Sequence, residues 1–285
     1  MNLQDIVNGL QAYWSRQGCL IVQPYDLEVG AGTMHPETFF RVLKPAPWRV
    51  AYTQPSRRPA DGRYGDNPFR LYKHLQYQVI LKPSPENVQD LYLGSLEQIG
   101  IDLKRHDIRF EEDNWEAPTL GAWGVGWQVM LDGMEISQFT YFQQSGGVEL
   151  NPISVELTYG LERITMYLTK SQSIYDIPYN DTVAYRDVRL WEEREMSAYY
   201  FDTADVEELW HQFSFWEREC EACLSEELLY PAYEGVLKMS HLFNVLDARG
   251  VISVTQRASA IGRIRNLAVQ CAHRYLDRDN ADTGS

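Results

Sequence analysis

The sequence predicts an α+β fold, in which an antiparallel β-sheet flanked by helices is followed by an all-helical C-terminal region. Short apolar or alternating runs separated by Gly, Pro and Asp are typical of antiparallel strands. Beyond about residue 181, long helical patterns replace these strand signals. The predicted strands are 50–54, 75–81, 107–111, 126–130 and 134–144, and the predicted helices among them are 86–99 and 158–169.

The N-terminal segment begins with an amphipathic helical pattern over residues 3–17 that stops at Gly18. A short strand over residues 19–23 is expected to follow. Further along the chain, Asp132-Gly133 is a turn signal between two predicted strands, which indicates a hairpin.

The C-terminal part of the chain is predicted to be a separate helical domain. Ser253-Val-Thr-Gln256 resembles a capping box that opens a last helix extending to about Leu276, and residues 279–285 are expected to fray. We therefore predict a core over residues 1–180 and a helical domain over residues 181–285.

Composition narrows the possible functions. The 285 residues carry 26 Lys+Arg and 40 Asp+Glu, a formal charge of −14, which disfavours a surface that holds nucleic acid by phosphate contacts alone. A polynucleotide would therefore meet a local basic patch or another subunit.

The absence of a long apolar run or a leader-like N-terminus predicts a cytoplasmic protein without membrane contact. The four cysteines indicate reduced thiols, and Cys220-x-x-Cys223 favours two core residues over a metal site.

Arginines mark the first candidate site. Arg57 and Arg58 end a predicted strand, a Gly- and Asp-rich loop over residues 60–68 follows, and a returning strand begins near Arg70. Guanidinium groups stay charged and pair bidentately with phosphate oxygens, so this hairpin suits an anionic ligand. The alternative is a basic surface hairpin.

Two further segments carry polar residues in predicted strands. Glu156 ends a strand, Gly160 stands at the junction with a helix, and Arg163 lies in the first helical turn, where it could reach a phosphate. The alternative is a helix start with an intrahelical ion pair. Gln138 and Thr140 alternate with larger side chains, so one face of their strand could line a pocket.

The order of these segments resembles the three ordered motifs of class II aminoacyl-tRNA synthetases. Within that class the sequence is most similar to the family of catalytic alpha subunits of bacterial two-subunit glycyl-tRNA synthetases. The stretches 30–40, 113–118 and 156–163 carry this resemblance, which covers essentially the whole chain. The stretch 155–163 is also similar to the third motif of the alanyl enzyme.

The resemblance implies a glycine–tRNA ligase that uses ATP and Mg²⁺ to form glycyl-adenylate and passes the glycyl group to the 3′ adenosine of tRNA(Gly). One of Arg57 and Arg58 would hold the α-phosphate and the glycine carboxylate, and Arg163 would hold the terminal phosphate. The glutamate that the second motif places two residues after its arginine is missing, since Pro59 and Ala60 occupy those positions. The residues implied for ATP binding are Arg57, Arg58, Arg70, His74, Gln76 and Arg163.

The resemblance also implies a glycine pocket. Glu156 would pair with the ammonium group of glycine and, being one methylene longer than the aspartate of the alanyl enzyme, would help to exclude alanine. The residues implied for glycine binding are Trp115, Gln78, Gln138, Thr140, Glu156 and Thr158. Trp115 could instead be an ordinary core aromatic. Glu135 is a possible Mg²⁺ ligand by chemistry only.

Partners follow from the same resemblance. The family pairs this chain with a larger beta subunit in an α2β2 assembly, in which residues 3–24 resemble the segment that forms the alpha homodimer. Arginines of the helical C-terminal region could contact RNA or an acidic neighbour, or could simply be solvated; they are Arg257, Arg263, Arg265, Arg274 and Arg278. A non-catalytic class II paralogue acting as a regulatory subunit is an alternative, against which the presence of Arg57, Arg58 and Arg163 argues. A stand-alone enzyme that forms an amide or adenylate from a small acid is another.

Overall fold

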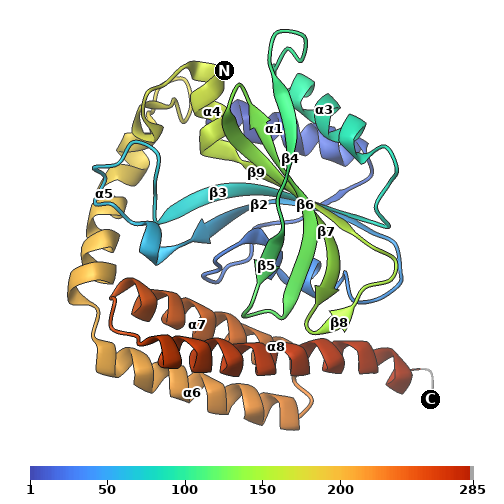
Figure 1. The fold of residues 1–285 in the computed structure, drawn as a ribbon, viewed down its shortest axis with the longest axis vertical. Coiled ribbons are helices and arrows are strands. Elements are labelled where there is room, and N and C mark those ends of the chain that lie inside the picture. The colour runs from blue at the N-terminus through green and yellow to red at the C-terminus, as the bar shows by residue number, and fades with distance from the viewer. Residues whose placement is uncertain (283–285) are drawn as a thin grey trace.

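The computed structural model describes residues 1–282 and contains one nine-stranded sheet (Figure 1). The strands are β1 (Leu20–Ile21), β2 (Trp48–Arg57), β3 (Lys73–Lys82), β4 (Ile108–Glu112), β5 (Trp115–Ala117), β6 (Ala122–Leu131), β7 (Met134–Ser145), β8 (Val148–Glu149) and β9 (Val155–Gly160). Their order is β1-β2-β3-β9-β7-β6-β4, with β5 paired to β6 and β8 to β7. β1 and β2 are parallel, and the other paired strands are antiparallel.

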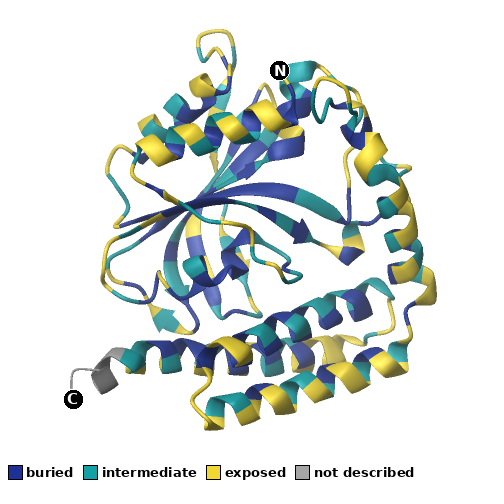
Figure 2. Cartoon of the chain, turned by 180° about the vertical axis from the view of Figure 1, so that it is seen from behind, coloured by how far each residue is buried: buried dark blue, intermediate teal, exposed yellow. Residues whose placement is uncertain are grey.

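Helices cover both faces of the sheet (Figure 1). They are α1 (Leu3–Arg16), α2 (Pro36–Phe39), α3 (Val88–Gln98), α4 (Leu161–Thr169), α5 (Tyr185–Ala198), α6 (Val206–Ser225), α7 (Leu229–Ala248) and α8 (Val254–Asp282). One apolar cluster joins the sheet to α1, α3 and α4, and the other joins it to α2 and α6–α8. Figure 2 shows the sheet as largely buried between these layers, with exposed residues on the outer sides of the helices. The predicted α+β fold and the helical C-terminal region are confirmed.

Local chemistry explains the well-predicted elements. Asn2 and Asp5 form a capping box at the start of α1, with hydrogen bonds of 2.9 and 3.0 Å, and the apolar face of the helix is buried in the core. Gly18, with φ +81°, follows the end of the helix. Asp132 and Gly133, with φ of 47° and 87°, form the turn between β6 and β7 because both left-handed conformations match the strand twist.

Several element boundaries differ from the prediction. Residues 158–160 belong to β9 rather than to the following helix, because their backbone pairs with β3 and the ladder outweighs local helical periodicity. The predicted strand over residues 19–23 is reduced to the two residues of β1, and β3 begins at Lys73 rather than near Arg70. The last helix continues to Asp282; of the tail expected to fray, residues 283–285 lie outside the described residues.

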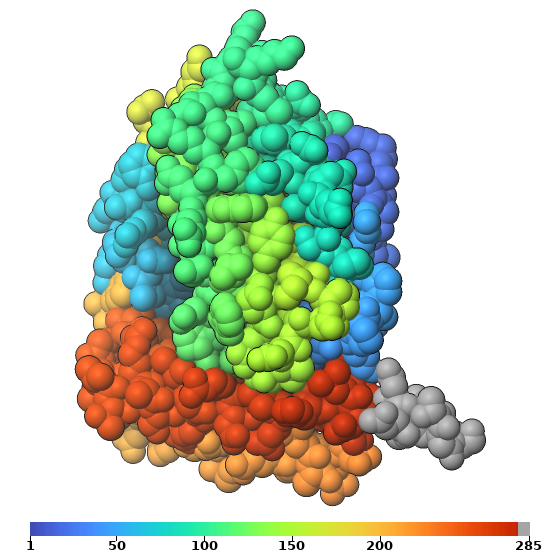
Figure 3. Space-filling view, turned by 45° about the vertical axis from the view of Figure 1, so that its right-hand side comes forward, coloured from blue at the N-terminus to red at the C-terminus, as the bar shows by residue number. Residues whose placement is uncertain are grey.

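The helical region packs directly on the sheet. Tyr52 of β2 and Ile80 of β3 belong to the same apolar cluster as Tyr233 of α7. Figure 3 shows α8 as a band beneath the ends of β6–β8, and Gly146 lies so close to it that an added Cβ would stand 2.3 Å from that of Ala272. The division of the chain at residue 180 stays a prediction.

Two features of the structure bear on metal binding and on membrane insertion. Cys220 is buried in the core of the helical region, and among the described residues no group of three or more His, Cys, Asp or Glu could hold a metal ion. In this same part of the chain, every helix is too short or too polar to cross a bilayer.

Candidate active site

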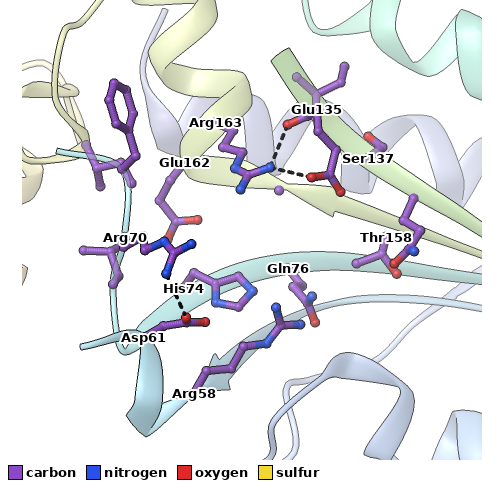
Figure 4. Close-up of a pocket in the computed structure, with 16 residues that line it drawn as sticks. Arg58, Asp61, Arg70, His74, Gln76, Glu135, Ser137, Thr158, Glu162 and Arg163 are labelled. Atoms are coloured by element: carbon purple, nitrogen blue, oxygen red, sulfur yellow. Dashed lines mark hydrogen bonds and ion pairs between the residues drawn. The ribbon is translucent and has the colours of Figure 1, made fainter. Parts of the chain in front are cut away.

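A cavity of about 280 Å³ opens over the sheet where β3, β7 and β9 approach the start of α4 (Figure 4). Asp61 and Glu162 line it, although sequence reasoning assigned them no role. The lining also includes eight residues that the sequence predicted for the site: Arg58, Arg70, His74, Gln76, Glu135, Gln138, Thr158 and Arg163.

The two neighbouring arginines at the end of β2 have different surroundings. Arg58 lines the cavity, and its Nε donates a hydrogen bond of 3.2 Å to the carbonyl oxygen of Gly30. Arg57 lies outside the cavity beside Tyr72 and Tyr200. Burial raises the pKa of Tyr200 to about 12, and the charge of Arg57 acts in the opposite direction. Only Arg58 of this pair can therefore reach a ligand in the cavity as it stands.

Arg163 faces the cavity from the first turn of α4. Its Nη1 lies 2.8 Å from Oε2 of Glu135 and donates to the Glu135 carbonyl oxygen at 3.1 Å (Figure 4). Both side chains are partly exposed, so an incoming anion could compete for the guanidinium group. The N-terminus of α4 adds partial positive charge at the same place.

The remaining charges leave the cavity suited to an anion. Arg70 extends toward Asp61, with 3.9 Å between their nearest charged atoms. Burial, together with the nearby charges of Arg58 and Arg163, lowers the pKa of His74 to about 3. The imidazole is therefore neutral at pH 7, and three guanidinium groups and three carboxylates line the cavity. The carboxylate of Glu162 already accepts hydrogen bonds from Leu75 and Tyr185, which leaves Asp61 and Glu135 as the partial counter-charges.

A buried carboxylate adjoins this cavity. Glu156 of β9 is 2% exposed, and Oγ1 of Thr33 lies 2.8 and 2.9 Å from its two oxygens. Thr158, which lines the cavity, donates to Gln78 at 3.0 Å and stands 3.4 Å from Glu156. The Nε2 atom of Gln78 is buried and has no hydrogen-bond partner. A fixed set of polar groups thus surrounds one carboxylate at the inner edge of the cavity.

Glu156 lacks a counter-charge. Burial raises its pKa to about 7, and the groups that act against this are Thr33, Gln78 and Thr158, all of them neutral. A carboxylate in such surroundings favours a cationic ligand, because the ligand supplies the positive counter-charge that the neighbouring side chains do not. The primary ammonium group of an amino acid has that charge and three donors.

The segment from Gly30 to Met34 closes the far side of this carboxylate. The N–H of Gly32 donates to Gln76 at 2.9 Å, and its carbonyl oxygen accepts the Tyr52 hydroxyl at 2.9 Å. A Cβ at Gly32 would lie 2.6 Å from Oε1 of Gln78, so only glycine fits there without displacement. In the sequence, this segment contributed only to the family resemblance. Its glycine-rich composition was the signal that could have indicated its place beside the carboxylate.

Some predicted site residues lie elsewhere. Trp115 packs edge-to-face against Phe142, with ring centroids 5.4 Å apart, and joins the core cluster rather than the cavity lining. Thr140 is buried directly opposite Glu156 in the pairing of β7 with β9. Gln138, in contrast to these two, lines the cavity and donates to Asp113 at 2.7 Å. The roles given to these residues stay predictions.

The fold and the site together define a class II aminoacyl-tRNA synthetase: a mostly antiparallel sheet that carries one arginine at a strand-loop-strand segment and another at a strand-to-helix junction. The model of the glycyl-tRNA synthetase alpha subunit family matches residues 3–280. The chain belongs to this family, and it is an aminoacyl-tRNA ligase that acts on glycine.

Solved structures give a more distant comparison. Two structures of a pyrrolysyl-tRNA synthetase from Desulfitobacterium hafniense are similar to 64% of this chain. They are 14% and 15% identical to it, with TM-scores of 0.42 and 0.44, and the match covers 72% and 75% of their chains. Membership of the synthetase family itself implies use of ATP, generally with Mg²⁺, and the family's name implies a beta subunit and a tRNA substrate.

Proposed function

We propose that the arginine-lined cavity binds the phosphates of ATP and that Glu156 binds the ammonium group of glycine at its inner edge. The observation that supports this is the position of Thr158, which both lines the cavity and contacts the buried carboxylate. The two substrates would thus meet with the glycine carboxylate directed toward the phosphates. Holding two reactants in this way supplies much of the catalysis in such a reaction.

The reaction requires charge neutralisation rather than an enzyme nucleophile. A carboxylate oxygen of glycine bonds to the α-phosphorus while the bond to the bridging oxygen breaks, and pyrophosphate leaves with the electron pair. Arg58 is the arginine that we assign to the α-phosphate and the glycine carboxylate, because it faces the cavity. Arg163, at the opposite wall, is assigned to the terminal phosphate. Fixed guanidinium groups stabilise the developing charge on the phosphates.

Glu156 and its neighbours provide selectivity for glycine. The longer glutamate side chain places its carboxylate deeper into the pocket than an aspartate would, in space that a substrate methyl group needs. Thr33 and Thr158 hold the carboxylate by hydrogen bonds, and the buried Nε2 of Gln78 is a further donor within this pocket. Steric exclusion of larger substrates suffices here, since glycine has no smaller competitor.

Glu135 fits the requirements of a Mg²⁺ site on the phosphates. It lines the cavity and is partly exposed, and its Oε2 pairs with the partly exposed guanidinium group of Arg163. Mg²⁺ commonly takes one or two carboxylates together with phosphate oxygens and water. A bound ion would neutralise phosphate charge that Arg163 does not reach.

The beta subunit is proposed to hold the body of tRNA(Gly) in an α2β2 enzyme. The charge of −14 disfavours an RNA grip on this chain. Three arginines of α8 are already ion-paired within the chain, to acids at positions 247, 217 and 227; they are Arg257, Arg263 and Arg274. The alpha homodimer is assigned to α1 and β1, where Leu20 stands exposed on the edge strand.

Glycine-dependent ATP–pyrophosphate exchange tests the assignment. The purified chain, with and without its beta subunit, is assayed with glycine, alanine and serine. We expect exchange with glycine alone and its loss in Arg163→Ala. Exchange that persists in Arg163→Ala at the wild-type KM for ATP would overturn the phosphate assignment.

A further inference from the structure

Helix α5 lies along the outside of the segment that joins β2 to β3 (Figure 1). This segment, residues 58–72, carries Arg58, Asp61 and Arg70 into the cavity. It has little regular structure of its own beyond one short turn at residues 59–61. The position of its arginines therefore depends on what packs against it.

One carboxylate of α5 holds this segment at two points. Glu193 is 2% exposed, and its Oε1 accepts the backbone N–H of Arg63 at 2.9 Å while its Oε2 accepts that of Tyr72 at 2.9 Å. Ser197, one turn later, accepts the N–H of Tyr64 at 3.0 Å and donates to Glu193 at 3.3 Å. A charged acceptor makes these bonds stronger than neutral ones, and its loss would leave buried N–H groups unsatisfied.

The segment also approaches α5 more closely than side chains would allow. A Cβ at Gly62 would lie 2.8 Å from Oγ of Ser197, and one at Gly65, where φ is +78°, would lie 2.5 Å from Cδ1 of Leu190. Glycine at these two positions permits the contact. The conformation of the segment is thus fitted to the surface of α5 rather than set by a hairpin turn.

The same helix reaches the second arginine-bearing segment. Its first residue, Tyr185, donates to the carboxylate of Glu162 at 2.7 Å, and that carboxylate also accepts the N–H of Leu75 at 2.8 Å. Glu162 directly precedes Arg163 in α4. Helix α5 therefore contacts the supports of both arginines that face each other across the cavity.

We propose that Glu193 is a positioning residue for ATP activation, which clamps the 58–72 segment on α5 so that Arg58 and Arg70 face Arg163. This inference rests on the proposed binding of ATP in the cavity. Glu193 does not line the cavity and acts only through the segment that it holds. A misplacement of catalytic groups by about 1 Å can lower a rate by roughly a hundredfold, so the clamp should matter for catalysis.

Kinetics of Glu193→Ala and Glu193→Gln, each in the full chain with its beta subunit, test the proposal. In pyrophosphate exchange we expect the KM for ATP to rise roughly 10- to 100-fold in Glu193→Ala. The KM for glycine should rise less, because Arg58 also holds the glycine carboxylate whereas Glu156, on β9, is not part of the clamped segment. Glu193→Gln should be affected less, since its amide oxygen can still accept one N–H. Glu195→Gln, an exposed position on the same helix, is the matched control and should behave as wild type.

Limited trypsin digestion gives a second readout that needs no activity. Cleavage after Arg63 and Arg70 should be faster in Glu193→Ala than in Glu195→Gln, and ATP should slow it. Wild-type KM for ATP and wild-type digestion in Glu193→Ala would overturn the clamp, as would an equal loss for both substrates. If Arg58→Ala leaves both the turnover and the KM for ATP unchanged, the proposed function of the cavity fails instead, and digestion alone then decides whether Glu193 holds the segment.

Discussion

Replacing Glu156 by glutamine should stabilise the protein at pH 8 while strongly lowering its activity with glycine. The carboxylate is buried without a paired cation, and burial raises its pKa from the ordinary 4.5 to about 7. Between about pH 4.5 and pH 7, the folded chain therefore keeps a proton on Glu156 that the unfolded chain has released. The contribution of this group to the free energy of unfolding is complete below pH 4.5 and falls as the pH rises through about 7.

The size of the effect follows from the shift. A rise from 4.5 to about 7 corresponds to about 3 kcal/mol. Because glutamine is neutral at every pH, Glu156→Gln should match wild type near pH 4.5 and exceed its stability by up to about 3 kcal/mol at pH 8. Urea denaturation of both proteins across this range measures the difference, and Glu149→Gln, an exposed position, should show none.

Glycine binding should show the opposite trend with pH. Below about pH 7 Glu156 becomes protonated and loses the charge that pairs with the ammonium group, so the KM for glycine should rise about tenfold per pH unit. In Glu156→Gln the exchange activity should fall at least about a hundredfold, as expected when a buried ion pair loses one partner. A glycine KM that is flat from pH 5.5 to 8.5, with Glu156→Gln no more stable than wild type at pH 8, would refute this account of the pocket.

Other substitutions separate catalytic from structural roles. Arg58→Ala should lower exchange turnover by roughly 10²- to 10³-fold, as for removal of a transition-state donor. Arg57→Ala should leave the KM for both substrates within about twofold and should instead lower the melting temperature. The reverse ranking of the two variants would contradict the placement of Arg58 in the cavity. Gly32→Ala should raise the KM for glycine and destabilise by about 1–3 kcal/mol, because its Cβ would lie 2.6 Å from Gln78. Gly262→Ala, in open space on α8, is the control and should be neutral or stabilising by up to about 1 kcal/mol in thermal unfolding.

The sequence predicted those parts of the fold that depend on local chemistry. The capping box of α1 and the Asp132-Gly133 turn involve neighbouring residues, so short-range patterns suffice. Residues 158–160 were assigned to the wrong element because their strand conformation comes from pairing with β3, about 80 positions away. Ladder hydrogen bonds of this kind leave no mark on local periodicity.

The residues of the candidate site likewise fall into those that local sequence indicates and those that depend on distant contacts. Arg58 and Arg163 could be found because charged residues at strand ends and helix starts are visible in sequence. Which of two adjacent arginines turns toward the cavity depends on the path of the chain after β2, and that path follows α5 rather than any local turn rule. Thr33 was missed because its contact with Glu156 joins positions that are 123 residues apart.

The two parts of the site, the arginine-lined cavity and the buried carboxylate of Glu156, carry opposite charges. The chain as a whole is strongly acidic, yet its guanidinium groups converge where the phosphates are proposed to bind, and one carboxylate beside them is left without a counter-charge. The guanidinium groups of the cavity are only partly neutralised by the partly exposed carboxylates of Asp61 and Glu135, and Glu156 is desolvated. Anionic phosphates would neutralise the guanidinium groups, and a cationic ammonium group would neutralise Glu156. The site thus places positive groups where the phosphates are proposed to bind and an uncompensated carboxylate where the ammonium group is proposed to bind. The zwitterionic form of glycine carries both the charge that pairs with Glu156 and the carboxylate that faces Arg58.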